Sequence, residues 1–118
     1  MKITKFNNLL RHEVAVHSNR GILNFPPGGR VIRSASARRI VEPIHYKDYK
    51  IQCSEIVYDP IKLPPEKSGV GLIVSAIVAS ELKILGVERS DIFTVDQKKR
   101  DPVTQEVTGC EGLIHWSL

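Results

Sequence analysis

The residues best suited to chemistry in this sequence are those that would bind an anion. Ser75 stands where an apolar run passes into a helix-like pattern, and a cluster of cations follows the next apolar run: Lys98, Lys99 and Arg100. A helix N-terminus offers unpaired amides and the positive end of its dipole, and basic side chains add charge-assisted hydrogen bonds. The pattern predicts a phosphate site, if the two apolar runs are neighbouring parallel strands. A capping serine beside a solvated turn is the alternative.

A second candidate for anion binding is the segment FPPGGR, residues 25–30. Gly28 and Gly29 permit positive φ angles and close approach of a ligand to the backbone amides. Arg30 would then hold the anion, and Arg33 follows three residues later as a further oxyanion partner. An ordinary turn explains the same letters, so both interpretations stay open.

Catalytic and metal-binding patterns give no comparable signal. Cys110 would need a base to become a nucleophile, and His115 falls five residues later on the same expected strand, with its side chain on the other face. A buried structural thiol is the better interpretation. The four histidines have no recognised metal spacing. We assign no catalytic residue, no metal and no cofactor, and favour a protein that is not an enzyme.

The elements that must position the predicted anion site come from the stretch SGVGLIVSAIVASELKILG, residues 68–86. We expect a strand over 70–74, then a helix from Ala76 to about Leu85, with Ser75 as its N-cap and Gly86 just past its end. A strand over 92–95 completes a βαβ unit, whose crossover is right-handed if the strands are parallel. Ser75, Ser80, Glu81 and Lys83 interrupt the apolar run, so we exclude a membrane span.

Most of the remaining chain is expected to be β. Strands are predicted over 12–18, 22–25 and 50–58, with a hairpin turn at SNRG, and a last strand follows a turn at Asp101 and Pro102. Residues 31–41 look extended but receive no assignment. The predicted fold is α+β: a single small domain, residues 1–118, with a mixed or mainly antiparallel sheet and one principal helix at about 76–85.

Composition narrows the class of protein. The chain has 118 residues and 42% hydrophobic content, which suits one domain with a core of its own. Charges interrupt the N-terminal segment, which argues against a secretory signal, and two cysteines suit a reducing cytoplasm. Residues 1–50 hold 10 basic and 3 acidic residues (+7) and residues 51–118 hold 7 and 10 (−3), which together give the net +4. This asymmetry predicts a basic face, whose partners would be phosphates, nucleic acid or an acidic protein.

Five segments, taken in order, carry a resemblance: NFPPGGR, LPP, LIVSAIVASEL, ERSDIFTVD and RDPVTQEVTGC. Together they resemble a family of short uncharacterised bacteriophage and prophage proteins over roughly residues 22–113. Gly28 stands where that family has serine, and residues 102–106 form a different turn. The resemblance implies a phage origin and the cytoplasm of an infected host cell. It implies no established activity.

These observations lead to one functional hypothesis and two alternatives. The hypothesis is a non-enzymatic binder, expected to be a homo-oligomer, that sequesters a phosphate-containing, nucleotide-like small molecule such as a host antiviral defence signal. Its predicted ligand-binding residues are Ser75, Lys98, Lys99, Arg100, Arg30 and Arg33. One alternative is a module that binds nucleic acid or a host protein through the basic N-terminal half. The other is an enzyme resembling a phosphodiesterase.

Overall fold

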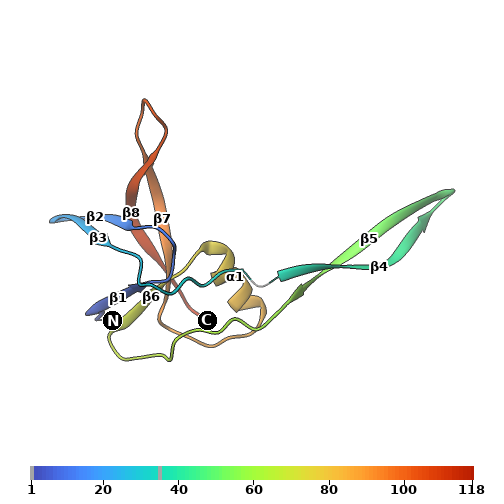
Figure 1. Cartoon of the computed structure of the whole chain (residues 1–118), viewed down its shortest axis with the longest axis horizontal. Helices are drawn as coiled ribbons and strands as arrows, with labels where there is room; N and C mark the ends of the chain where they lie inside the picture. Colours follow the sequence, from blue (N-terminus) through green and yellow to red (C-terminus); the bar gives the residue numbers. More distant parts are fainter. Residues whose placement is uncertain (1, 35) are drawn as a thin grey trace.

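A computed structural model of the chain describes residues 2–34 and 36–118 (Figure 1). Met1 and Ala35 lie outside the described residues, and Ala35 falls within the segment 31–41, which received no assignment from the sequence. The elements are β1 (Lys5–Asn8), β2 (Val14–Ser18), β3 (Gly21–Phe25), β4 (Ser36–Tyr46), β5 (Tyr49–Tyr58), β6 (Val70–Ile73), α1 (Ala76–Ile84), β7 (Ile92–Arg100) and β8 (Val107–Trp116).

Six of the strands form one mixed sheet in the order β1-β6-β7-β8-β2-β3. β6 pairs in parallel with both β1 and β7, β8 pairs in parallel with β2, and the β7–β8 and β2–β3 pairs are antiparallel. The sheet curls until its outer strands approach each other. A bridge joins Asn8, at the end of β1, to Pro27, just beyond β3, and the rings of Phe6 and Phe25 meet edge to face at 5.2 Å.

The predicted βαβ unit is present as β6, α1 and β7, with its two strands parallel. Ser75 is the N-cap, and its hydroxyl oxygen accepts a hydrogen bond from the Val78 amide at 3.2 Å. The helix ends at a Leu85 C-cap, after which Gly86 adopts φ 73°, a left-handed conformation that glycine takes without steric cost. The expected cap, helix span and terminating glycine are therefore confirmed.

Two apolar clusters lie on the two sides of the curled sheet. The alternation along β6 separates them, because successive side chains of a strand point to opposite faces. Leu72 and Val74 pack with Val78, Ala79 and Leu82 of α1. Ile73 packs inside the curl, in a cluster with Val14, Val16 and Cys110.

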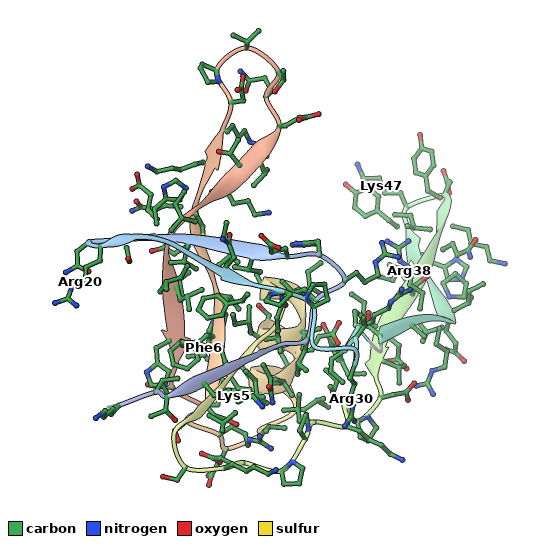
Figure 2. The ribbon with its side chains drawn as sticks, turned by 60° about the vertical axis from the view of Figure 1, so that its left-hand side comes forward. Lys5, Phe6, Arg20, Arg30, Arg38 and Lys47 are labelled. Atoms are coloured by element: carbon green, nitrogen blue, oxygen red, sulfur yellow. The ribbon has the colours of Figure 1, made fainter. Side chains whose placement is uncertain are left out.

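β4 and β5 form a separate two-stranded sheet that does not join the six-stranded one. Figure 1 shows this hairpin, here called the arm, projecting far from the rest of the chain, which we call the body. Arg38 and Lys47 lie on the arm, whereas Phe6 lies in the body (Figure 2). The arm accounts for part of the elongated shape, whose principal extents are 63 × 41 × 24 Å.

The predicted α+β class is wrong. Eight strands and one nine-residue helix occur in the described residues, so the structure is mostly β, with a curled mixed sheet and a second, two-stranded sheet. The strand residues that were not predicted lie in β1 and in the two long hairpins, where β4 continues to Tyr46 and β7 continues through the charged residues up to Arg100. Charged, exposed stretches lack the apolar alternation that identifies half-buried strands, and this is why their extent was underestimated.

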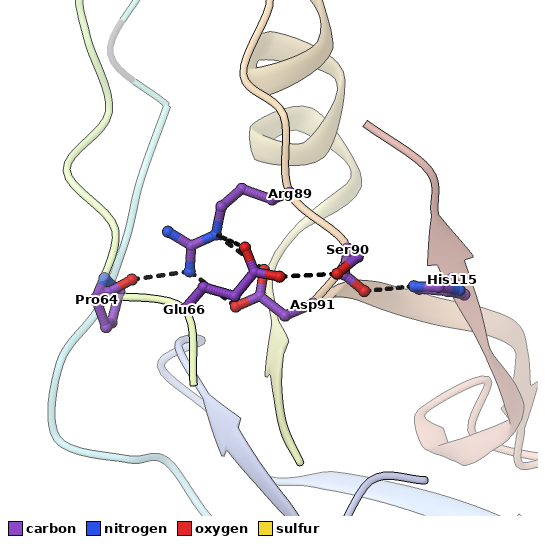
Figure 3. A network of polar contacts seen from close by, with 6 residues as sticks. All are labelled: Pro64, Glu66, Arg89, Ser90, Asp91 and His115. Atoms are coloured by element: carbon purple, nitrogen blue, oxygen red, sulfur yellow. Dashed lines mark hydrogen bonds and ion pairs between the residues drawn. The ribbon is translucent and has the colours of Figure 1, made fainter. Parts of the chain in front are cut away.

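The chain returns from the arm to the body through a loop held by Arg89 (Figure 3). The Arg89 guanidinium donates to both carboxylate oxygens of Asp91, at 3.0 and 2.8 Å, and to the Pro64 carbonyl at 2.8 Å. Glu66 lies 3.6 Å from the same guanidinium and accepts a hydrogen bond from Ser90. The hydrogen bond to Asp91, followed by the negative charges of Asp91 and Glu66, raises the pKa of Arg89, because these interactions stabilise the charged form.

No helix in residues 2–34 and 36–118 is long and apolar enough to cross a bilayer.

Candidate anion-binding site

A groove of about 370 Å³ opens beside the first turn of α1. Its polar wall comes from three separate parts of the chain: the loop after β1, the segment that leads to β4, and the start of the helix. We call it the helix-start groove. Its polar lining residues are Arg11, His12, Arg33, Ser34 and Ser75, and no carboxylate lines it.

The start of α1 supplies hydrogen-bond donors to this groove. The first amides of a helix have no partner within the helix, and the dipole places partial positive charge there. Ser75 satisfies the Val78 amide, which leaves the amides at the very start of the helix directed outward. Since the Ser75 oxygen is an acceptor in that bond, its hydroxyl proton remains available to donate.

A buried asparagine positions Arg11 and His12. Asn8 is only 1% exposed, and its side-chain amide donates to the carbonyls of His12 at 2.8 Å and Phe25 at 2.9 Å. Its carbonyl oxygen accepts from the Leu10 amide at 2.9 Å. These bonds tie the loop after β1 to the end of β3, so Asn8 determines where the loop presents its two basic side chains.

The segment that carries Arg33 is attached on either side of it. The Ile32 amide donates to the Leu9 carbonyl at 3.1 Å, and the Ser34 hydroxyl donates to the carboxylate of Glu81 on α1. Glu81 is buried and does not itself line the helix-start groove. Arg33 itself is exposed and lines the groove, so its guanidinium is accessible to a ligand.

The structure divides the predicted site residues among several places. Ser75 and Arg33 line the same groove, although they were assigned to two different candidate sites in the sequence. Lys98 lines a neighbouring groove of about 460 Å³ between β2 and the β7–β8 hairpin. His12 lines both grooves. Ser75 and Lys98 therefore line two separate grooves, which share His12, and do not form the single pocket expected at the strand ends.

The other three predicted residues contact protein groups elsewhere. The Lys99 ammonium lies 3.3 Å from the Glu111 carboxylate on β8. Arg100 donates to the Gln105 carbonyl at 3.0 Å, within the turn of the β7–β8 hairpin. Arg30 donates to the Lys62 carbonyl at 3.1 Å, and lines neither groove.

The FPPGGR segment does not present its first glycine amide to a ligand. The Gly28 amide donates to the Asn8 carbonyl at 2.8 Å, and a Cβ at Gly28 would lie 3.1 Å from that same oxygen. Glycine is needed here because two backbone segments approach closely. Gly29 has φ 89°, as the sequence suggested.

Cys110 and His115 do not meet. In the β7–β8 register Cys110 is opposite Lys98, whereas His115 is opposite Phe93 and stacks on its ring at 4.7 Å. Cys110 is 1% exposed, and burial raises the pKa of its thiol, which disfavours the reactive thiolate. Within the described part of the chain, no three His, Cys, Asp or Glu side chains gather into a group that could hold a metal ion.

Sequence reasoning missed Arg11 and His12 as groove residues. Their position depends on the parallel pairing of β1 with β6, which lies 65 residues later in the chain, and on Asn8. The only local signal was the pair of asparagines in NNLLRHE, because a buried asparagine often organises a turn.

Comparison with known proteins adds no relative to this picture. No protein-family model, no curated protein and no solved structure matches the chain.

Proposed function

We propose that this protein is a non-enzymatic binder that holds a phosphate-bearing, nucleotide-like small molecule in the helix-start groove. The observation that supports the proposal is the lining of the groove: two arginines, a histidine and a helix N-terminus converge there, with no carboxylate. Phosphate oxygens bind to such a set through charge-assisted hydrogen bonds. Sequestration needs no further chemistry from the protein.

The apolar part of the groove favours a nucleotide over a bare anion. Leu10, Val31 and Ile77 contribute to its lining, and Ile77 is 65% exposed. A flat base would cover this surface while the phosphate lies at the helix start. The volume of about 370 Å³ falls within the range of small-molecule sites. The adjoining groove, which both Lys98 and Glu13 line, offers room for the sugar or another polar part of a larger ligand.

The setting we propose for this activity is the cytoplasm of a phage-infected cell, where the ligand would be a nucleotide signal of host defence. This part of the proposal depends on the resemblance to short phage proteins.

The arrangement of side chains on the arm argues against the nucleic-acid alternative. A single-strand site interleaves basic and aromatic side chains on one surface. In the arm register Tyr46 pairs with Tyr49, whereas His45 pairs with Lys50. Neighbouring residues of a strand point to opposite faces, so these tyrosines and the His45–Lys50 pair lie on different sides of the arm.

The test of the proposed function is calorimetric titration with cyclic dinucleotides, ADP-ribose and inorganic phosphate. We expect one or more nucleotides to bind, and Arg33→Ala and Arg11→Ala each to weaken the binding by about tenfold or more, as loss of a charge-assisted hydrogen bond predicts. Arg20→Ala is the matched control, because it removes the same charge from an exposed turn outside the groove.

Three results would contradict the proposal. One is the absence of binding for the whole ligand panel. Another is an equal loss of affinity in Arg20→Ala and Arg33→Ala, which would indicate general electrostatic attraction. The third is chemical conversion of the bound nucleotide, detected by chromatography after incubation, which would favour the enzyme.

A further inference from the structure

The two faces of the β4–β5 arm differ in composition. Residues paired across the ribbon share a face, and alternate residues along each strand lie on opposite faces. The register pairs Val41 with Cys53, Ile44 with Ile51, and Tyr46 with Tyr49. These pairs share one face, because the irregularity between Val41 and Ile44 compensates for the odd spacing on β4. We call this face the apolar arm face: Val41, Ile44, Tyr46, Tyr49, Ile51 and Cys53.

The apolar arm face is largely open to solvent in the single chain. Tyr46 is 56% exposed and Tyr49 is 68% exposed, and Ile44 and Ile51 are also exposed. A two-stranded hairpin by itself is at best marginally stable in water, and needs packing on one face. The arm does not join the six-stranded sheet, and the exposure of these four residues shows that this face lacks such packing in the single chain.

We propose that a second copy of this chain covers the apolar arm face, so that two arms pack face to face about a two-fold axis. The charges support a second copy as the occupant. The same side of the arm carries Arg39 and Glu55, which form an ion pair across the strands. One positive and one negative charge make this side self-complementary, and Arg39 of one copy is able to pair with Glu55 of the other.

The opposite side of the arm is unsuited to the same contact. By the alternation along the two strands, this side carries three basic residues, Arg38, His45 and Lys50. It also carries the exposed Ile40 and Ile56, so the basic side chains, and not a lack of apolar surface, distinguish it. Two copies of this basic side would repel each other. The chemistry of the arm therefore selects one of its two faces for self-association.

The available area is sufficient for a dimer. A whole tyrosine contributes roughly 150–250 Å², so the exposed parts of Tyr46 and Tyr49 supply about 190–310 Å². With the aliphatic residues and the Arg39–Glu55 pair, each copy would bury roughly 600–800 Å², close to the 800 Å² or so per partner of a standard interface. This inference depends on the arm alone, and not on ligand binding at the helix-start groove.

The decisive experiment is sedimentation equilibrium of the full chain across a range of concentrations. We expect the wild-type protein to be a dimer and Ile51→Lys to raise the dissociation constant by about tenfold or more, since a buried charge is introduced. Gln52→Lys is the matched control: it makes the same charge change one residue away, on the opposite side of the arm, and should leave the dimer intact.

Alkylation of the two cysteines provides a second readout and a control for folding. Cys53 lies on the apolar arm face and is partly exposed in the single chain, whereas Cys110 is buried in the body. We expect Cys53 to react slowly in the wild-type dimer and faster in Ile51→Lys. Continued protection of Cys110 in the variant shows that the body remains folded.

Four outcomes would overturn the proposal: a wild-type protein that is monomeric at every concentration, a dimer that survives Ile51→Lys, equal dissociation by Gln52→Lys and Ile51→Lys, or an assembly that disappears after nuclease treatment. The last outcome would show that nucleic acid, and not contact between two arms, holds the assembly together.

Discussion

The packing of the body depends on the absence of a side chain at Gly71. A Cβ at this position would lie 2.6 Å from Phe6 Cε1 and 3.0 Å from Phe93 Cε2. The two rings meet edge to face with centroids 5.2 Å apart, inside the curl of the sheet. The strand β6 thus approaches the aromatic pair as closely as it does only because residue 71 has no side chain.

Gly71→Ala should therefore destabilise the protein. Crowding a packed core costs about 1–3 kcal/mol, whereas the lower entropy of the unfolded chain returns about 0.4–1 kcal/mol. The clash is the larger effect, so we expect a net loss of about 1–2 kcal/mol in the free energy of unfolding, measured by urea denaturation.

Gly112→Ala is the control for this substitution. Gly112 also lies in a strand, β8, and a Cβ there would meet no atom within 4 Å. Its replacement should be neutral or stabilising by up to about 1 kcal/mol. An equal loss of stability in both variants would contradict the role of the contact with Phe6 and Phe93.

At the scale of elements, the β7–β8 hairpin ends in a turn that Asp101 organises. Its carboxylate accepts hydrogen bonds from the amides of Val103 at 2.8 Å and Thr104 at 2.9 Å. These two hydrogen bonds lower the pKa of Asp101, because they stabilise its charged form. The bond from the Thr104 amide has the larger effect and the bond from the Val103 amide the next. Together with Arg100, which donates to the Gln105 carbonyl, the carboxylate determines the path of the turn.

The lowered pKa of Asp101 predicts that the stability of the turn depends on pH. A carboxylate whose folded pKa lies below the unfolded value of about 3.9 stabilises the fold above that value, and the contribution is lost as pH falls through the folded pKa. In an NMR titration, the Asp101 carboxyl should titrate below about 3.9. The amide shifts of Val103 and Thr104 should change with the same midpoint.

Asp101→Asn separates charge from geometry in this turn. The amide oxygen is still an acceptor, so the turn should remain, while the pH dependence of the two amide shifts should disappear. An unchanged titration of those amides in Asp101→Asn would show that another group is responsible.

The whole molecule is a body with an arm, and the arm's connection to the body depends on a few polar contacts. The loop that leaves β5 is attached at Pro64 and Glu66, and Arg89 contacts both as well as the buried Asp91 (Figure 3). The Arg89 side chain is 15% exposed and that of Asp91 is 6% exposed. Removing one member of so buried a pair leaves the other charge without compensation.

We expect Arg89→Ala to lower the free energy of unfolding by about 3–5 kcal/mol, measured by urea denaturation. The stability of Arg89→Lys should lie between that of Arg89→Ala and that of the wild type, because lysine keeps the charge but loses the bidentate hydrogen bond to Asp91. The comparison variant is Arg20→Ala, an exposed arginine at the β2–β3 turn. A loss of stability in Arg89→Ala no greater than in Arg20→Ala would contradict this role.

The sequence by itself determined the features that depend on neighbouring residues. Ser75, the apolar spacing over 76–84 and Gly86 specify the helix and both its ends, because capping and helical periodicity act within one or two turns. The SNRG turn and the strands on either side of it follow from turn chemistry and alternation in the same way. The buried thiol of Cys110 was also expected, because the sequence offers no base on the same face of its strand.

Only the tertiary structure decided the class of fold, the separation of the arm and the composition of the helix-start groove. β-pairing joins residues far apart in the chain, and a strand's alternation does not identify its partner: β1 pairs with β6 across more than 60 residues. That pairing, with the bonds of Asn8, brings Arg11 beside Arg33 and Ser75 and leaves Lys98 in the next groove. The arm and the outer part of the β7–β8 hairpin are mostly exposed, so the burial pattern from which strands are recognised is weak in them.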